Sequence, residues 1–310
     1  MSSHTPRPQS AIIPEPSRHA VFLILGVHDP EKNGPAVAKI LTEVPALIES
    51  LGATDRDAAL VGSVGFGSGF WDVISPGRRP AGLRPFSAID AAGQTAPSTG
   101  GDVLVHLIAE RQDLNFELAM QLRTCLGDRV AVMDEVHGFR YLDSRDLTGF
   151  IDGTENPEGD AERAEVALIG AEDSEFAGGS YVFTQRYVHQ LTKWAAISEQ
   201  EQEGAVGRRK ADSEELPDDI KPPTAHISRV VIEEDGEELE IVRHSFPYGT
   251  LDEHGLFFIA YTKDLGIPEK MLRRMLGTSG DGHHDRLMDF TQAVSGAHFF
   301  APSLEVLSQL

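Results

Sequence analysis

The segment GFIDGTENP, residues 149–157, places a carboxylate and several hydrogen-bonding groups beside an apolar Phe-Ile pair. A carboxylate held against apolar side chains can have a raised pKa, so Asp152 could carry a proton in a reaction. The run Gly153, Thr154 and Glu155 offers successive backbone N–H groups that could bind an anion. The segment could also consist only of two turns, at Asp152-Gly153 and at Asn156-Pro157. These residues therefore suggest acid–base or anion chemistry without specifying a reaction.

Arg243 lies in the apolar run EIVRHSFPYG, where an unpaired guanidinium would be costly. A carboxylate or an anionic ligand should therefore face it. The turn signal Asp235-Gly236 predicts a hairpin in which Ser228 lies opposite Arg243 and His226 lies opposite Ser245. Diagonal neighbours on one face of such a sheet are roughly 7–8 Å apart. We therefore expect His226 and Arg243 to line one pocket or to flank one ligand.

The histidines do not form a metal site by spacing. None of the 12 histidines belongs to a His-Glu-x-x-His or similar zinc pattern, and the run His283-His284-Asp285 would point its side chains apart on a helix. His226 follows a Pro-Pro-Thr-Ala lead-in and could be a hydrogen-bonded structural residue. From the residues alone, a metal-free binding domain for an anionic ligand stays open.

The composition excludes several classes of protein. The net charge of −22, from 49 acidic and 27 basic residues, repels nucleic acids and anionic membranes. The single cysteine, Cys125, rules out an internal disulfide framework, a Cys-rich zinc site and a Cys-ligated iron–sulfur cluster, and its apolar helical surroundings predict a core position. Residues 1–16 show no signal peptide, and the apolar stretches are too short to span a bilayer of ~30 Å. We therefore expect a cytoplasmic protein without nucleic-acid or membrane partners.

Hydrophobic periodicity predicts an α+β protein in which residues 1–18 form a flexible N-terminal arm. The next part, residues 19–140, follows the order β-α-β-β-α-β, which is the split β-α-β pattern of ferredoxin-like folds. Its strands are predicted at residues 20–27, 57–64, 102–109 and 129–136, and its helices at 35–50 and 113–126.

Residues 181–310 repeat this order more loosely. Strands are predicted at residues 181–188, 229–234, 237–245 and 255–262, and helices at 191–203, 268–276 and 284–294. Residues 141–180, which contain Asp152, connect the two parts, and functional sites tend to lie on such segments between rigid elements. The predicted architecture is two ferredoxin-like halves whose antiparallel sheets pack together, with helices on the periphery.

The motif that opened this section also resembles the signature of a known family. GFIDGTENP looks like the GxxDG motif of the dye-decolorising peroxidases, and the chain resembles their bacterial B-type subfamily from Val21 to Leu307. The collinear stretches that carry this resemblance are GDVLVHLIAERQDLNFELA, DEVHGFRYLDSRDLTGFIDGTENP, GGSYVFTQRYVHQL, IVRHSFPYG and FFAPSLEVL. The resemblance implies haem b as the cofactor, hydrogen peroxide as the oxidant and a small organic molecule as the reductant.

The resemblance also implies roles for individual residues. His226 stands at the position of the axial ligand of the haem iron, and Asp152 and Arg243 stand on the opposite, distal face. A carboxylate on the other nitrogen of the histidine would raise its basicity, with Asp285 as the first candidate and Asp289 as the second. The remaining positions expected to contact haem, several of them beside a propionate, are Gly153, Thr154, Glu155, Asn156, Arg208 and Phe258.

The implied reaction reduces hydrogen peroxide and oxidises dyes or phenolics through a ferryl intermediate. Asp152 could shuttle the peroxide proton, and Arg243 could stabilise the charge that develops as the O–O bond breaks. Bulky dyes could not reach a buried iron, so electrons would come through aromatic residues. The candidates are Trp194, Tyr187 and Tyr181, although each could be a packing aromatic.

Three features depart from the family pattern or limit what it implies. Ser245 stands where many B-type members carry Asn and could hold a water in place of the amide, and Arg209 stands where they carry Thr. The sequence ends at Leu310 without a Gly/Ser/Leu-rich tail, so packaging in a protein nanocompartment is not expected. A homo-oligomer is expected.

The main alternative function is that of a haem-handling protein without peroxidase turnover. A chlorite-decomposing haem enzyme does not suit the motif.

Overall fold

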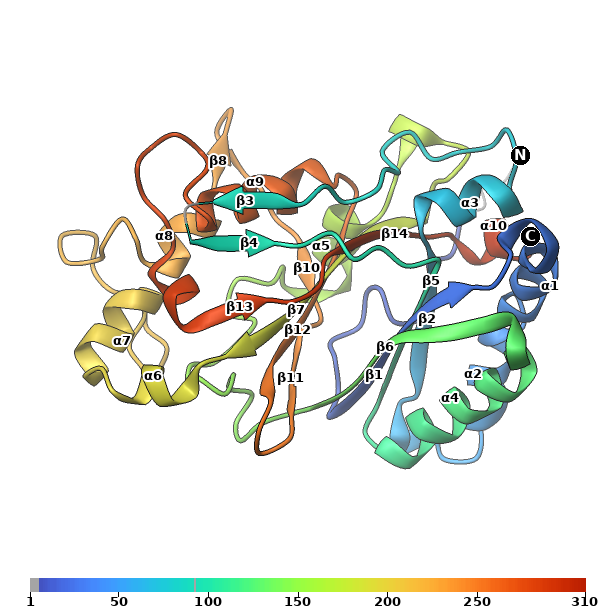
Figure 1. The fold of residues 1–310 in the computed structure, drawn as a ribbon, viewed down its shortest axis with the longest axis horizontal. Helices are drawn as coiled ribbons and strands as arrows, with labels where there is room; N and C mark the ends of the chain where they lie inside the picture. The colour runs from blue at the N-terminus through green and yellow to red at the C-terminus, as the bar shows by residue number, and fades with distance from the viewer. Residues whose placement is uncertain (1–5, 92) are drawn as a thin grey trace.

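The computed structural model describes residues 6–91 and 93–310. Its main strands form one ten-stranded antiparallel sheet in the order β10-β12-β11-β6-β1-β5-β2-β14-β7-β13, and a further pairing of β12 with β7 closes the sheet on itself (Figure 1). The chain therefore has a mixed α/β fold with antiparallel strands, as its periodicity predicts. The two halves do not keep separate sheets packed together, because their edge strands join.

The N-terminal half contributes four neighbouring strands in the order β6-β1-β5-β2. Its elements are β1 (His19–Val27), α1 (Pro30–Leu41), α2 (Val44–Gly52), η1 (Arg56–Ala58), β2 (Val61–Phe66), α3 (Ser68–Ile74), β3 (Ile89–Ala91), β4 (Gln94–Ala96), β5 (Val103–Ala109), α4 (Gln112–Leu126), η2 (Gly127–Arg129) and β6 (Val130–Phe139). Every residue of β5 is buried, which suits its continuous apolar run. Helices α1, α2 and α4 cover this half on the right of Figure 1.

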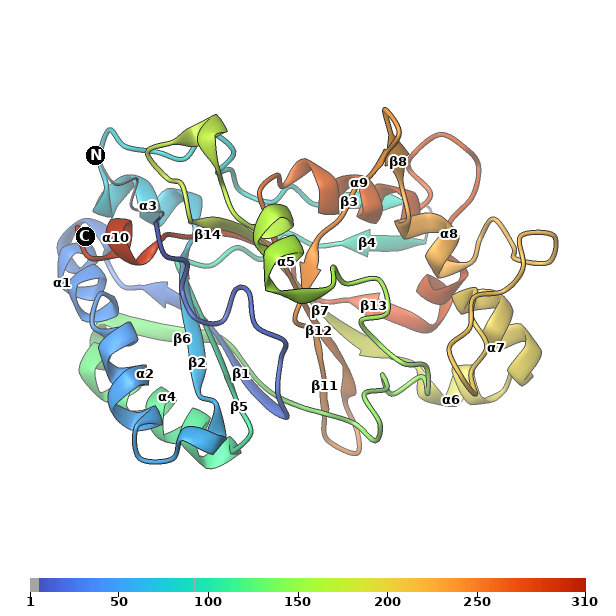
Figure 2. The same cartoon turned by 180° about the vertical axis from the view of Figure 1, so that it is seen from behind.

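The C-terminal half contributes a second set in the order β11-β12-β7-β14. Its elements are α5 (Gly159–Ala167), η3 (Ala171–Asp173), β7 (Ser180–His189), α6 (Leu191–Ala195), α7 (Glu199–Val206), α8 (His226–Val230), β8 (Glu233–Glu234), β9 (Glu237–Glu238), β10 (Val242–Arg243), β11 (Phe246–Gly249), β12 (His254–Thr262), α9 (Gly266–Met275), η4 (Arg286–Phe290), β13 (Thr291–Ala293), β14 (Ala297–Ala301) and α10 (Leu304–Leu307). Figure 2 shows the segment between β6 and α5 crossing the middle of the molecule.

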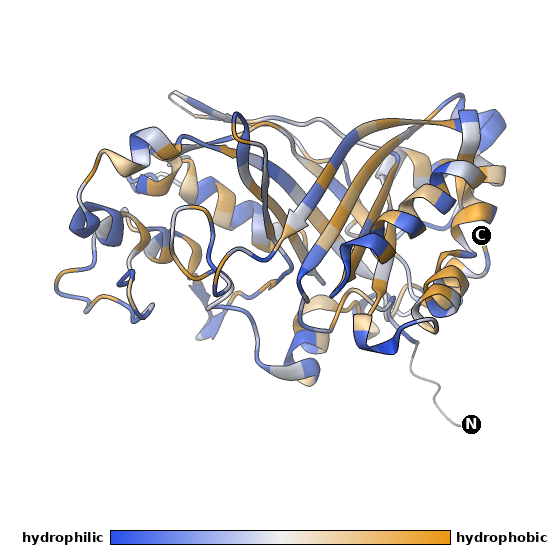
Figure 3. Cartoon of the chain, turned by 90° about the horizontal axis from the view of Figure 1, so that it is seen from below, coloured by the Kyte–Doolittle hydropathy of each residue, from blue (hydrophilic) through white to orange (hydrophobic). Residues whose placement is uncertain are grey.

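The two halves meet at two narrow joints. Tyr248 of β11 pairs with Gly138 of β6, and Phe300 of β14 pairs with Phe66 of β2. A Cβ atom at position 138 would lie 2.5 Å from the Cβ of Phe246, so only glycine allows this approach. Hydrophobic residues are frequent along the strands near these joints, and the outer helices carry both hydrophobic and hydrophilic residues (Figure 3).

Two predictions about burial are wrong. Cys125 is exposed, because the buried stripe of α4 runs through Leu114, Leu118, Leu122 and Leu126 at four-residue spacing. The segment predicted to be a flexible arm is packed from residue 9 onward: Ala11 and Ile12 are fully buried, and the Gln9 side chain bonds both backbone groups of Val64. A short apolar segment between prolines shows no hydrophobic periodicity, so its burial could not be predicted from the sequence pattern.

Several predicted elements change type or divide. The predicted strand 229–234 begins as helix α8, which ends at Val230, and only Glu233–Glu234 is extended. The predicted helix 284–294 is the 3-10 helix η4 followed by strand β13. The predicted helices 35–50 and 191–203 are each two shorter helices. The strands β1, β5, β6, β7 and β12 lie within a few residues of their predicted positions.

No helix of the described residues is both long and apolar enough to cross a membrane.

Candidate active site

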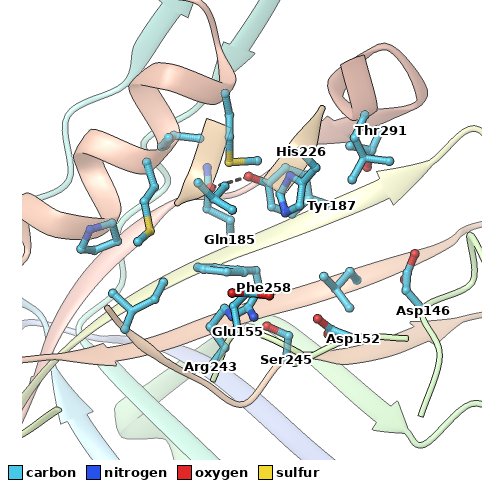
Figure 4. Close-up of a pocket in the computed structure, with 18 of the residues that line it drawn as sticks. Asp146, Asp152, Glu155, Gln185, Tyr187, His226, Arg243, Ser245, Phe258 and Thr291 are labelled. Atoms are coloured by element: carbon cyan, nitrogen blue, oxygen red, sulfur yellow. Dashed lines mark hydrogen bonds between the residues drawn. The ribbon is translucent and has the colours of Figure 1, made fainter. Parts of the chain in front are cut away.

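A large cavity lies in the C-terminal half, between helices α8 and α9 on one side and the segment around Asp152 on the other (Figure 4). It encloses about 1270 Å³, including the part open to solvent. Most of its wall is apolar, from Phe150, Ile151, Phe183, Val206, Val230, Leu239, Leu256, Phe258, Met271, Leu272, Met275 and Leu287. The cavity therefore suits a large, mainly apolar ligand.

His226 lies at one wall of this cavity as the first residue of α8. Its Nδ1 is 2.6 Å from Oδ2 of Asp285, which is completely buried and whose Oδ1 accepts the backbone N–H of Leu287. Because Nδ1 donates to a carboxylate, the Nε2 lone pair is free for another partner. The structure thus places Asp285 beside His226, whereas Asp289 contacts His284 and Arg286.

Asp152, Arg243 and Ser245 lie together on the wall opposite His226 (Figure 4). Burial raises the pKa of the Asp152 carboxyl and the charge of Asp146 adds to this, although Arg243 and the N–H of Gly153 oppose it. Oδ1 of Asp152 accepts that N–H at 2.7 Å, which leaves Oδ2 free. A carboxyl whose pKa is raised by burial therefore stands beside a permanent cation.

The same three residues also line a second cavity of about 1350 Å³, which is mainly polar. Its other wall residues include Arg140, Arg145 and Arg163. Asp152, Arg243 and Ser245 thus form the partition between an apolar cavity large enough for a cofactor and a polar cavity open to solvent.

The predicted hairpin register is confirmed at the turn, where Glu234 pairs with Glu237, but the ladder does not extend to His226 and Arg243. Asp235 and Gly236 form the turn, both with positive φ, but the ladder ends at Glu233 and Glu238. Arg243 pairs with Ala260 of β12 instead of with Ser228. His226 lies on helix α8 and not on a strand of the hairpin, and it reaches the cavity from that helix.

Asn156 lines the polar cavity. Its side chain does not line the large cavity; instead, it holds the backbone of Arg243. Gly153, with φ +83, and Thr154 line the polar cavity only. Because a glycine turn aims this part of the segment away from the large cavity, of the predicted cofactor contacts here only Glu155 faces it.

Two further predicted residues differ in how directly they meet the cavity. Phe258 lines the cavity wall, whereas Arg208 lies behind it. Arg208 forms an ion pair with Glu155 and donates to the carbonyl oxygen of Ser213. Glu155, which does line the cavity, therefore has a guanidinium partner.

Sequence reasoning missed a hydrogen-bonded Asp–His pair that lines the cavity. Asp146 and His189 line it with Oδ1 and Nε2 3.1 Å apart. Burial alone would raise the pKa of Asp146, but His189 and the two hydrogen bonds from Thr148 outweigh it and lower the pKa. Asp146 and Thr148, which directly precede the GFIDGTENP motif, were the only sequence signal for this pair.

The donor set fits haem better than a bare metal ion. No cluster of three or more His, Cys, Asp or Glu side chains suited to a metal ion occurs in residues 6–91 and 93–310. An imidazole that is oriented by a carboxylate and faces a broad apolar cavity, as His226 does, is the arrangement that holds an iron whose other ligands belong to a macrocycle. Tyr187 also lines the cavity beside His226, while Trp194 and Tyr181 are buried outside it.

Family models match most of the chain. One described as Dyp-type peroxidase, N-terminal, covers residues 9–140, and one described as Dyp-type peroxidase, C-terminal, covers residues 143–306. The chain is 44% identical over 292 residues to the dye-decolorizing peroxidase of Mycolicibacterium paratuberculosis, which covers 93% of this chain and 81% of that protein. Against the Mycobacterium tuberculosis dye-decolorizing peroxidase the identity is 41%, with coverage of 93% and 86%.

Solved structures agree with these relatives. DyPB from Rhodococcus jostii RHA1 superposes with a TM-score of 0.94 at 42% identity, covering 99% of each chain. A variant of that protein in complex with heme gives a TM-score of 0.93 at 42% identity over 98% of each chain. With an imidazole and a carboxylate–guanidinium pair facing each other across a cavity of this size, the chain belongs to the haem-dependent Dyp-type peroxidases and is a peroxidase enzyme.

Proposed function

We propose that this chain reduces hydrogen peroxide and oxidises organic donors, namely dyes and phenolics, through a ferryl intermediate. One observation carries the proposal: His226, held by Asp285, faces Asp152 and Arg243 across an apolar cavity. Bound haem supplies the two-electron redox chemistry. The chain's own residues hold that cofactor, move the peroxide proton and stabilise charge.

His226 holds the cofactor through Nε2. The hydrogen bond of Nδ1 to Asp285 fixes the tautomer and makes the imidazole more electron-rich. Since Asp285 is fully buried and capped by the N–H of Leu287, it cannot turn away from the histidine without leaving its charge unpaired. The pair therefore presents Nε2 to the cavity in a fixed orientation.

Asp152 moves the peroxide proton. Its free Oδ2 takes the proton from one peroxide oxygen and returns it to the oxygen that leaves as water. Burial brings the pKa of this carboxyl closer to the working pH than that of an exposed aspartate, which suits a group that must both accept and donate. Ser245, on the same wall, contributes a hydroxyl that positions peroxide or a water.

Arg243 stabilises the negative charge that develops as the O–O bond breaks. Its side chain is charged throughout, and its backbone is fixed by Asn156. Peroxide reaches this pair through the polar cavity, whose wall ends at Asp152, Arg243 and Ser245. Small polar molecules therefore meet the two functional groups before they meet the cofactor.

The remaining predicted contacts complete the cofactor site. The resemblance implies that Phe258 would contact bound haem and that Arg208, paired with Glu155, would lie near a propionate. We also propose that residues 19–140 and 181–310 are two ferredoxin-like halves connected by residues 141–180. A cytoplasmic homo-oligomer is the form in which we expect the enzyme to work.

Titration of the haem-reconstituted protein with peroxide tests the proposal. A change of the Soret band on adding peroxide, reversed by a phenolic donor, is the expected result. The matched control is His226→Ala, which should lose tight haem binding because it removes the imidazole proposed to bind the iron. His189, which also lines the cavity, has both ring nitrogens within hydrogen-bond distance of other side chains, those of Thr291 and Asp146. Tight haem binding without any peroxide-dependent change would instead identify a haem-handling protein and would contradict the proposal.

A further inference from the structure

A hydrogen-bonded cluster in the core takes no part in the chemistry described above. Tyr261 on β12, His106 on β5 and Ser63 on β2 are each at most 1% exposed. The Tyr261 hydroxyl lies 2.8 Å from Nδ1 of His106 and 2.7 Å from Oγ of Ser63. The arrangement that satisfies the phenol has Ser63 donating to Tyr261 and Tyr261 donating to the imidazole.

The surroundings of this cluster are apolar. Phe22 stacks on His106 with ring centroids 4.7 Å apart, and Nε2 of His106 has no hydrogen-bond partner among the described residues. Burial holds the pKa of His106 well below its usual value and raises that of Tyr261. At rest, both side chains are therefore neutral, with the proton on the phenol.

The cluster lies close behind the large cavity. Tyr261 is three residues beyond Phe258 of the cavity wall, about 10 Å along an extended strand. The ring of His244 lies 5.6 Å from that of Tyr261, and its neighbours in the chain, Arg243 and Ser245, both line the cavity. An electron can tunnel through the packed side chains that separate Tyr261 from the cavity, whereas a substrate molecule cannot pass between them.

The other redox-active aromatics lack a base to receive a proton. All five tyrosines and both tryptophans lie in the described part of the chain. Tyr187 donates to an amide oxygen, and Tyr248, Trp71 and Trp194 donate to backbone carbonyls. Tyr181 accepts the N–H of Gly82, and the partly exposed Tyr141 would release a proton only to water. Among these seven side chains, only Tyr261 has a nitrogen base within hydrogen-bond distance.

We propose that Tyr261 and His106 form an internal redox pair that stores one oxidising equivalent when no donor is bound. The step rests on the proposed function, because peroxide-oxidised haem is the oxidant. Tyr261 gives it one electron, the phenolic O–H bond breaks, and the proton moves to Nδ1 of His106. The products are a neutral tyrosyl radical and an imidazolium, and both steps reverse when a donor returns an electron. A one-electron-oxidised phenol is a strong acid, so even an imidazole weakened by burial accepts its proton.

Electron paramagnetic resonance of the holoenzyme tests this pair. The haem-loaded protein is mixed with an equimolar amount of peroxide without donor and frozen within seconds. We expect a tyrosyl signal that persists in Y187F and Y141F and disappears in Y261F. His106→Gln should abolish it too, because an amide can accept the hydrogen bond but not the proton. In wild-type protein carrying ¹⁵N-histidine, electron–nuclear double resonance should detect coupling to an imidazole nitrogen, which tests the pair even if a variant fails to fold.

The possible results separate this inference from the proposed function. An unchanged tyrosyl signal in Y261F, loss of the signal in Y141F, or absence of the histidine coupling would overturn the pair. A normal peroxide-dependent Soret change without any tyrosyl signal would overturn it as well, while leaving the peroxidase proposal intact. If peroxide does not change the Soret band at all, both proposals are wrong.

Discussion

Asn156 and Arg243 are joined by two hydrogen bonds that take the place of a strand neighbour. The Arg243 N–H donates to Oδ1 of Asn156 at 3.0 Å, and Nδ2 of Asn156 donates to the Arg243 carbonyl oxygen at 2.8 Å. Because β10 pairs on its other side with β12, the asparagine completes the hydrogen bonding of this short strand. The side chain of a loop residue thus sets the position of the arginine at the partition between the two cavities.

Asn156→Ala should therefore affect the enzyme through Arg243. Loss of two hydrogen bonds should lower the free energy of unfolding by about 1–2 kcal/mol. A shifted guanidinium should also slow the reaction with peroxide by roughly 10- to 100-fold, because small misplacements of catalytic groups are costly. The matched control is Asn156→Asp, which keeps the acceptor for the N–H and loses only the donor. Stopped-flow measurement of the Soret change checks both; equal rates in Asn156→Ala and wild type would contradict the role.

Arg243→Ala should keep haem and lose reactivity. The residue lies on the wall opposite His226, so its removal leaves the proposed iron ligand untouched. We expect the peroxide reaction to slow by about 10²-fold or more, as on loss of a preorganised donor to a developing anion. Arg243→Lys keeps the charge but not the forked geometry and should recover part of the rate. A wild-type rate in Arg243→Ala would remove the arginine from the mechanism.

Asp285→Asn should weaken haem binding without unfolding the protein. An amide can accept the hydrogen bond from Nδ1 of His226 but carries no charge to strengthen Nε2 as a ligand. We expect haem affinity to fall roughly 10- to 100-fold, the usual cost of losing such a partner. Asp289→Asn is the control, since Asp289 contacts His284 and Arg286 and not His226. Haem titration followed at the Soret band measures both variants, and similar losses in the two would argue against a specific role for Asp285.

The peroxide reaction should lose rate at acid pH through Asp152. Burial raises the pKa of this carboxyl above the ordinary value of 3.8, and only the ionised form can accept the peroxide proton. As the pH falls through the raised pKa, the fraction of carboxylate and the rate fall together. Asp152→Asn should be slower at neutral pH and lack this inflection. An inflection that survives in Asp152→Asn would have to be assigned to another group.

Secondary-structure elements with a regular hydrophobic pattern could be predicted from the sequence. The strands with long apolar runs, such as β5 and β12, lie near their predicted positions because burial on both faces leaves a continuous apolar signal. The closure of the sheet could not be predicted, since it depends on single residue pairs such as Tyr248 with Gly138. Asp152, Arg243 and His226 could be brought together by motif and charge arguments, whereas the clamp by Asn156 depends on a loop path that no pattern records.

Three buried histidines should make the folded state sensitive to acid. His106, His244 and His298 are each at most 3% exposed, and burial lowers their pKa values, to about 3 for His244 and about 4 for His298. The unfolded chain takes up protons on these groups near pH 6.5, so between pH 6.5 and 4 it binds more protons than the folded chain. Stability should therefore be fully present above pH 6.5 and fall as the pH drops, by at most about 1.4 kcal/mol per pH unit for each group.

His298→Gln separates this contribution from that of the acidic residues. Glutamine cannot titrate, so the slope of the unfolding free energy between pH 6.5 and 4.5 should decrease by roughly 1 kcal/mol per pH unit relative to wild type. The exposed His28 supplies the control, and His28→Gln should leave the slope unchanged. Urea unfolding of the haem-free protein at several pH values measures these slopes without interference from the cofactor. Parallel curves for His298→Gln and wild type would show that His298 is not buried in its neutral form, and would contradict the packing between Phe86 and Phe183 on which the prediction depends.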